Sequence, residues 1–306
     1  MHKSISTLLI IIGVITASIQ PAPPTKTSIT LNSLVGSCTV TEPVIIKLLQ
    51  SKGLQRLKKI AVGGIAPLAT TFAHNRSRYD HSVGVFMLLR NQKCSLIEQI
   101  AGLLHDVSHT VFSHVGNLVF DYDHDSQHIW FLKQTDIAKI LEKYGIELYK
   151  IDQTQNSLPG LEQALPEMCA DRLDYTINTA FLLKFLSKAD VKLILKHLHL
   201  KNGVWFFSDI DAARKLAYAS IFIVNNLFGN PANIMAYHWT ASALKRAIEI
   251  DLLTQKDVRF GTDKEIWQKL NESTDDLITR WVHMTKNCEN IVSIGSAEEF
   301  NMRVST

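Results

Sequence analysis

Apolar residues recur at intervals of three and four along most of this chain, and no other feature restricts its fold as strongly. That spacing is typical of helices that bury one face against a core. Gly145 and Gly229 follow two such segments and are typical helix stops. The segments with this spacing are 44–57, 83–89, 96–104, 129–144, 161–186, 212–227, 234–252 and 266–281. We therefore predict an all-α protein.

The clearest strand signal is a pair of short apolar runs, 198–200 and 204–207, separated by residues that include Asn202-Gly203. An Asn-Gly pair between apolar runs is typical of a β-hairpin. We predict one small hairpin within the helical fold.

Composition narrows the class of protein. A chain of 306 residues with 46% hydrophobic residues can bury a large core, which excludes disorder as the main state. Lysine and arginine (32) barely exceed aspartate and glutamate (29) and are scattered, so no nucleic-acid-binding patch is evident. The four cysteines form no C-x-x-C pair, which excludes a zinc ribbon. We predict a core over 37–190, which contains the site, and a helical C-terminal region over 191–306.

The N-terminal segment has the layout of a secretory signal. Lys3 precedes an apolar stretch over 8–19, and a Pro/Thr/Ser-rich linker is predicted over 20–36. The stretch is shorter than the roughly 20 residues that span a bilayer. We expect residues 1–19 to be a signal peptide or an anchor, which would export the protein or hold it at a membrane. The alternative is a cytoplasmic protein.

Histidine and aspartate gather in the first half of the chain. Seven of the twelve histidines fall between positions 74 and 128. Ser95 and Glu98 form a capping-box pattern at the start of an apolar helix, which runs directly into His105-Asp106 and, one turn later, His109. The sequence thus places polar, ionisable side chains at the end of a buried helix.

Two further segments supply matching groups. His81 lies just before an apolar helix, and Asp171, Asp174 and Tyr175 share one helix face. Buried polar groups without partners cost roughly 1–3 kcal/mol each, so this repeated placement indicates a common partner. Imidazole and carboxylate ligands together suit a divalent metal ion.

These residues resemble a known pattern. His81, His105-Asp106 and Asp171, in that order and at these intervals, are similar to the H…HD…D signature of HD-domain metal-dependent phosphohydrolases. The blocks around them (55–57, 78–85, 105–114 and 171–175) resemble the branch that contains deoxynucleotide triphosphohydrolases.

The resemblance implies an all-α HD fold and a role for each site residue. It implies that His81, His105, Asp106 and Asp171 bind a divalent ion such as Fe, Mn, Zn, Ni or Mg. It also implies acid and base roles for His109 and His124, supported by His114, and phosphate contacts from Arg78, Arg172 and Tyr175. The substrate would be a nucleotide or another small phosphoester. Related enzymes are often oligomeric, so a homo-oligomer is one expectation.

Several positions depart from this branch. Members of this branch often have a glutamine that contacts the sugar of the substrate, and Val62 stands in its place here. Asn178-Thr179 replace an Arg-Asp pair of that branch. Trp239-Thr240 stand where His-Lys is expected, and Asn117 replaces an acidic residue. These changes remove both a side chain that contacts the sugar and a positive charge near the outer phosphates. A different phosphoester or a wider substrate range is therefore credible.

Three functions remain open from the sequence. The first is a metal-dependent phosphohydrolase that acts on a nucleotide, such as a deoxynucleoside triphosphate, or on another small phosphoester. The second is a non-catalytic HD-fold protein that binds a nucleotide or a protein partner. The third is a zinc peptidase, because His105-x-x-x-His109 superficially resembles the zinc-binding H-E-x-x-H helix, although Asp106 is a shorter base than glutamate.

Overall fold

The structure is a computed structural model that describes residues 27–71, 73–122, 124–152 and 158–292. Helices make up 62% of it, and its strands form two small antiparallel hairpins. This confirms the predicted all-α fold.

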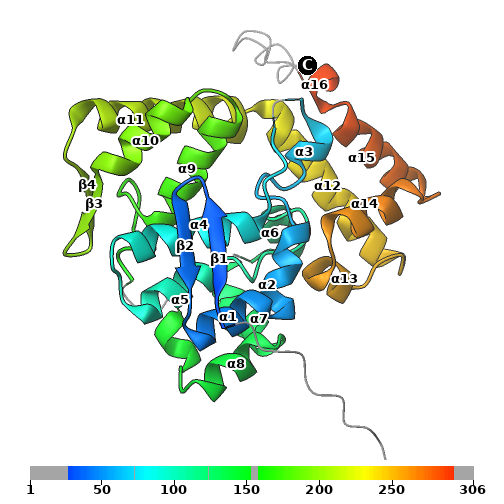
Figure 1. Cartoon of the computed structure of the whole chain (residues 1–306). Helices are drawn as coiled ribbons and strands as arrows, with labels where there is room; N and C mark the ends of the chain where they lie inside the picture. The colour runs from blue at the N-terminus through cyan, green and yellow to red at the C-terminus, as the bar shows by residue number, and fades with distance from the viewer. Residues whose placement is uncertain (1–26, 72, 123, 153–157, 293–306) are drawn as a thin grey trace, which may run out of the picture.

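Helices and strands follow one another along the chain as Figure 1 shows. The strands are β1 (Ile29–Ser33), β2 (Gly36–Val40), β3 (Leu198–Lys201) and β4 (Val204–Phe207). The first helices are α1 (Pro43–Gln50), α2 (Lys52–Arg56), η1 (Leu57–Lys59), α3 (Ala66–Ala69), α4 (Arg78–Asn91), α5 (Leu96–Leu104), α6 (Val115–Phe120), η2 (Asp125–Gln127), α7 (His128–Lys133), α8 (Ile137–Lys143) and η3 (Leu148–Ile151). The later helices are α9 (Ala170–Leu182), α10 (Lys188–His197), α11 (Ile210–Ile223), the π-helix η4 (Val224–Phe228), α12 (Pro231–Glu249), α13 (Gln255–Phe260), α14 (Asp263–Asn271), α15 (Asp276–Lys286) and α16 (Cys288–Ile291).

Helix α5 has the predicted bounds, and Ser95 is its N-cap. The Ser95 side chain accepts a hydrogen bond from the Glu98 backbone N–H. The Glu98 carboxylate does not complete a capping box. It accepts a hydrogen bond from the backbone N–H of Gly160 at 2.8 Å and so ties α5 to the loop before α9.

Four of the longer predicted helices are divided or shortened. Segment 44–57 breaks at Ser51, whose hydroxyl caps α2 by accepting a hydrogen bond from Leu54 N–H. Segment 161–186 becomes helical only at Ala170, because Pro166 in the preceding stretch lacks an amide hydrogen. Segments 129–144 and 266–281 each form two helices. Apolar spacing continues across such breaks, so it cannot locate them.

The predicted hairpin is confirmed as β3–β4, with Asn202 and Gly203 both in the left-handed region of the turn. A second hairpin, β1–β2, corrects the predicted linker over 20–36, since residues 29–36 belong to it. Leu31 and Val40 point into the core while Thr30 and Thr39 point outward. Residues 20–26 lie outside the described residues.

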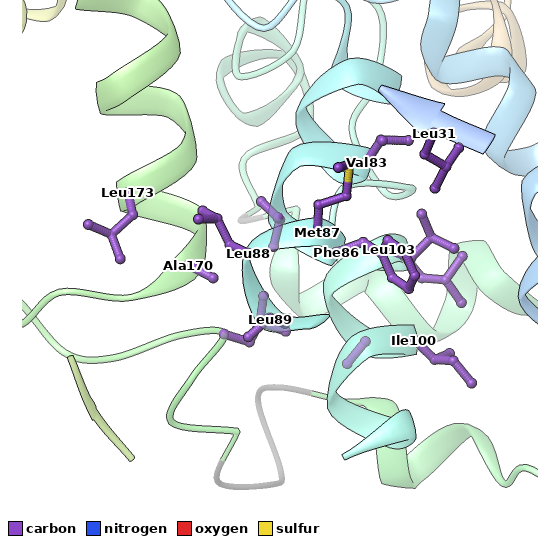
Figure 2. Close-up of a cluster of buried hydrophobic side chains, with 14 of the residues drawn as sticks. Leu31, Val83, Phe86, Met87, Leu88, Leu89, Ile100, Leu103, Ala170 and Leu173 are labelled. Carbon is purple, nitrogen blue, oxygen red and sulfur yellow. The ribbon is translucent and has the colours of Figure 1, made fainter. Parts of the chain in front are cut away.

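Helix α4 lies at the centre of the larger core, and ten of its fourteen residues are buried. Figure 2 shows its side chains packed among Leu31 of β1, Ile100 and Leu103 of α5, and Ala170 and Leu173 of α9. We call this cluster the α4 core. Because α4 lies within the core, Arg78 and His81 of its first turn are buried, whereas Asp80 is exposed.

A second cluster, which we call the α12 core, is built mainly from α12, α14 and α15. It also takes in Phe112, which lies early in the chain, whereas the α4 core extends to Leu227. Each core therefore contains residues from both sides of residue 190. The domain boundary at that position stays a prediction. In Figure 1 the β3–β4 hairpin and α15 lie on opposite sides of the molecule.

The expectation of export or membrane anchoring is corrected. Across 27–292, leaving aside the few positions not described, every helix is too short or too polar to cross a bilayer. The segment 1–19, on which the expectation rested, lies outside the described residues.

Candidate metal centre

The ends of three buried helices bring the four predicted ligands to one cavity. The first turn of α4 carries His81, and the first turn of α9 carries Asp171. Helix α5 ends directly before His105 and Asp106. All four side chains line the same cavity.

The segment from His105 to His109 is not the helical turn that the sequence predicted. Residues 105–108 form turns after the end of α5. Both histidines line the cavity, but they belong to different groups. His105 Nε2 lies 3.2 Å from His81 Nε2, whereas His109 Nε2 lies 3.2 Å from Asp106 Oδ1.

The nitrogen and oxygen atoms of the four residues that could bind a metal ion lie close together. His81 Nε2 lies 2.8 Å from Asp171 Oδ1 and 3.7 Å from Asp106 Oδ2. His105 Nε2 lies 3.4 Å from Asp171 Oδ1 and 3.4 Å from Asp106 Oδ1. Ligand atoms about 2.0–2.2 Å from a shared ion lie roughly 3 Å apart, so this set of two imidazoles and two carboxylates fits a divalent cation in spacing and in chemistry.

The electrostatics of the cluster also favour a cation. His81, His105 and Asp106 are buried. Burial would raise the pKa of Asp106, but the positive charge of Arg78 and the neighbouring histidines hold it well below its usual range. Burial would lower the pKa of His105, but Asp106 and Asp171 raise it to about 10. The two carboxylates thus hold positive charge at this point, and a metal ion would compete with protons for the same imidazole nitrogens.

Each imidazole is oriented by its other nitrogen. His81 Nδ1 lies 2.6 Å from Asp174 Oδ2, and His105 Nδ1 lies 2.8 Å from the carbonyl oxygen of Gly102. Both contacts favour a proton on Nδ1 and leave the Nε2 lone pair facing the cluster. Gly84 permits the close approach of α4 and α9, because a Cβ there would collide with Asp174 Oδ1.

Asp174 is itself held by a buried ion pair. Arg76 Nη1 donates to Asp174 Oδ2 at 2.6 Å, and Arg76 Nη2 donates to Oδ1 at 3.2 Å. Asn178 Nδ2 also donates to Oδ1 at 3.0 Å. The sequence analysis did not assign Arg76 or Asp174 to the site. The available signal was that Asp174 lies three residues after Asp171 on the same helix face.

Replacement of Asp174 by asparagine should weaken metal binding about 10–100-fold, since a partner that orients a ligand is lost. The protein should also lose stability, by as much as roughly 3–5 kcal/mol, because Arg76 keeps a buried charge without its counterion. Competition with a chelating dye and urea unfolding measure the two effects. Asp211→Asn, which removes an exposed ion pair with Arg214, is the matched control and should change neither. Unchanged metal affinity in Asp174→Asn would contradict the orienting role.

His109, His114 and His124 form a second group beside the first. The ring of His109 stacks on that of His124 with centroids 3.8 Å apart, and it meets the ring of His114 edge-on at 4.7 Å. His109 is buried, and its Nδ1 has no hydrogen-bond partner within the described chain. Burial and the positive charge of Arg78 hold the pKa of His109 well below its usual range, so its ring is neutral at pH 7. The spacing of the three rings could also accommodate a cation.

Of the three residues predicted to contact phosphate, two line the cavity and one does not. Arg78 lines the cavity and donates from Nη1 to Asp106 Oδ2 at 2.8 Å. Tyr175 also lines the cavity. Arg172 does not. It is turned toward the loop before α9, where it pairs with Glu162 Oε1 at 2.9 Å and donates to the carbonyl oxygens of Glu167 and Gln163. The structure therefore does not place Arg172 in the cavity lining, and its phosphate role stays a prediction.

The cavity has a volume of about 550 Å³ and a mixed lining. Besides the two histidine groups, it is lined by side chains that the sequence analysis did not assign to the site. They include the apolar Leu118, Leu227, Phe228 and Ile234 and the polar Asp125, Glu162, Asn233, Tyr237 and His238. Of the positions that depart from the deoxynucleotide branch, Val62 and Thr179 line the cavity, whereas Trp239 and Thr240 are buried in α12.

Comparisons with known proteins agree with this arrangement. The HD domain family matches residues 78–179, which span all four predicted ligands. The uncharacterised protein YdhJ of Bacillus subtilis is 35% identical over 237 residues, covering 76% of this chain and 72% of YdhJ. The metal-dependent phosphohydrolase cns2 of Cordyceps militaris is 29% identical over 255 residues, covering 80% of this chain and 73% of cns2.

Two solved structures share the fold. A phosphohydrolase from Bacteroides thetaiotaomicron superposes with a TM-score of 0.66 at 17% identity, covering 91% of this chain and 83% of that one. A hypothetical protein from Aquifex aeolicus has a TM-score of 0.71 at 18% identity, covering 91% of this chain and 81% of that one. At this level of identity the likeness concerns the fold alone.

Proposed function

Because the chain belongs to the HD-domain family of metal-dependent phosphohydrolases, we propose that it hydrolyses a small phosphoester, a class that includes nucleotides. The reaction adds water to phosphorus, breaks the P–O ester bond, and releases an alcohol and a phosphate. The observation that carries this proposal is the convergence of His81, His105, Asp106 and Asp171.

Those four residues would hold one divalent ion. When bound, such an ion supplies Lewis-acid stabilisation of phosphoryl charge and lowers the pKa of water. Arg78 stands at the edge of the ligand cluster, where its guanidinium can turn from Asp106 toward a phosphoryl oxygen. Tyr175, one turn after Asp171 on α9, also lines the cavity and would contact the substrate.

The second histidine group would move protons. His109 is neutral at pH 7 and lies beside Asp106, so it can accept a proton from the attacking water. His124 stacks on His109 and would return a proton to the leaving oxygen, with His114 packed against both rings. The packing of the three rings supports this proposal, because it places the imidazoles beside one another in the cavity lining.

The zinc-peptidase alternative does not fit the geometry. A zinc-binding H-E-x-x-H motif needs both histidines on one helix and directed at one ion. Here α5 ends before His105, and His109 belongs to the other histidine group. The remaining alternative is a non-catalytic binding protein, and measurement of turnover distinguishes it from an enzyme.

Metal removal and restoration test the proposal on a phosphoester panel. The panel contains phenyl phosphate, a nucleoside monophosphate and a deoxynucleoside triphosphate, with released phosphate, pyrophosphate and triphosphate identified. We expect the purified protein to hydrolyse at least one compound, to lose that activity after chelation, and to regain it with a divalent ion. Binding of these compounds in a thermal-shift assay without any turnover, across several metals, would instead indicate a non-catalytic protein.

A further inference from the structure

The charge of the cavity limits how many phosphoryl groups it can take. Among the described residues that line it, Arg78 is the only arginine or lysine, and it already pairs with Asp106. One divalent ion together with Arg78 supplies three positive charges, which Asp106, Asp125 and Asp171 of the lining offset, while Glu162 of the lining is paired with Arg172. The lining therefore holds no surplus positive charge for outer phosphates. A phosphomonoester carries nearly two negative charges at pH 7, whereas enzymes that act on triphosphates surround the outer phosphates with several cations.

The apolar side chains of the cavity lining suit an organic group. Leu227 and Phe228 reach it from the π-helix η4, and Ile234 reaches it from α12. The ring of Phe228 meets that of Tyr175 edge-on with centroids 5.9 Å apart. Apolar and aromatic walls of this kind favour an apolar or aromatic substituent, because they gain by covering it.

A buried polar side chain lies beside these apolar residues. Asn233 is 7% exposed and lines the cavity from the first turn of α12. Its Nδ2 donates to the carbonyl oxygen of Leu227 at 3.1 Å, but its Oδ1 has no hydrogen-bond partner within the described chain. A buried acceptor without a donor costs roughly 1–3 kcal/mol, so a ligand that supplies the donor is favoured over one that does not.

We infer that the cavity takes a phosphomonoester whose organic group is apolar or aromatic and carries a hydrogen-bond donor, such as an amino or hydroxyl group, that Asn233 Oδ1 accepts. This rests on the proposed function, since the phosphoryl group must face the metal ligands. It makes Asn233 a specificity-determining residue, and it excludes di- and triphosphates as preferred ligands.

Calorimetry with non-hydrolysable probes tests the inference on the metal-loaded full chain. The probes are phenylphosphonate, its 3-amino and 4-amino derivatives, and a methylene-bridged deoxynucleoside triphosphate. We expect at least one amino derivative to bind about 3–10-fold more tightly than phenylphosphonate, as one neutral hydrogen bond allows. The triphosphate analogue should bind more weakly than that derivative.

Asn233→Leu keeps the volume and removes the acceptor, so the preference for the amino derivative should disappear. Asn233→Asp retains an acceptor and should keep the preference, which guards against a folding defect in the leucine variant. Asn226→Leu is the matched control, because Asn226 makes the same kind of bond, from Nδ2 to the Phe222 carbonyl oxygen, but lies outside the cavity lining. Its preference should equal that of the parent protein.

Equal binding of phenylphosphonate and both amino derivatives, or a preference that survives in Asn233→Leu, would overturn the role of Asn233. Tighter binding of the triphosphate analogue would overturn the single-phosphoryl class, as would the failure of every probe to bind. Hydrolysis is scored separately: the expected binding pattern without turnover of phenyl phosphate and its amino derivatives would reject the proposed function and leave the inference on the ligand intact.

Discussion

Asp106→Asn is expected to abolish metal binding and to lower phosphoester hydrolysis by about 10³-fold or more. The carboxylate contacts both histidine groups, with Oδ1 at 3.4 Å from His105 Nε2 and at 3.2 Å from His109 Nε2. Asparagine keeps the shape but removes the negative charge. Loss of about 4 kcal/mol of stabilisation of the reacting phosphoryl group corresponds to about 10³ in rate.

Elemental analysis of the dialysed variant and kcat/KM on the best substrate of the panel measure the two losses. The substitution also leaves Arg78 as a buried cation without its counterion, so the melting temperature should fall. Asp276→Asn, at an exposed position of α15, is the control and should retain metal and activity. An Asp106→Asn protein with a full complement of metal would remove the basis of the proposed centre.

His109→Gln is expected to lower kcat by about 10²–10⁴-fold while the protein keeps its metal. The imidazole is 1% exposed, faces Asp106 and stacks on His124, but it is not among the four proposed ligands. Proton transfer by a positioned side chain contributes an acceleration of that size. Glutamine retains hydrogen-bonding ability but cannot accept a proton at neutral pH.

The same two readouts separate the roles of the two histidine groups. His109→Gln should lose turnover but not metal, whereas Asp106→Asn should lose both. Loss of one equivalent of metal in His109→Gln would indicate that His109, His114 and His124 hold an ion rather than transfer protons. Unchanged kcat would reject a proton-transfer role for His109.

The sequence was sufficient to predict the parts of the site that lie at helix ends. Apolar spacing located α5, and the polar pair that follows it could be recognised because charge at the end of a buried helix needs a partner. His81 and Asp171 were predicted instead from the resemblance to the H…HD…D signature, and the structure places them in the first turns of α4 and α9. Local pattern and the order of motifs carry this information without a structure.

Contacts between distant polar residues could not be predicted. Arg76 lies in the stretch before α4 and carries no motif in the sequence, and only the packing of this stretch and α4 against α9 buries it as a pair with Asp174. Arg172 follows Asp171 directly, but the next position on a helix points about 100° away, and the Arg172 side chain pairs with Glu162 without entering the cavity lining. Asn233 likewise gains a role only where α12 meets η4.

Local structure was missed where the pattern was short. Apolar and polar residues alternate over 29–32 and 37–40, as in strands, but each run is only four residues long, and the Ser and Gly residues nearby are typical of a linker. The α4 core therefore begins before the predicted boundary at residue 37, because Leu31 belongs to it.

Anomalous X-ray diffraction from crystals of the metal-loaded protein, collected on both sides of the metal's absorption edge, tests the central claim most directly. We predict a difference peak within bonding reach of His81 Nε2, His105 Nε2 and carboxylate oxygens of Asp106 and Asp171. A peak elsewhere with none at this position, or fully loaded crystals in which the four side chains bind no ion, would contradict the account.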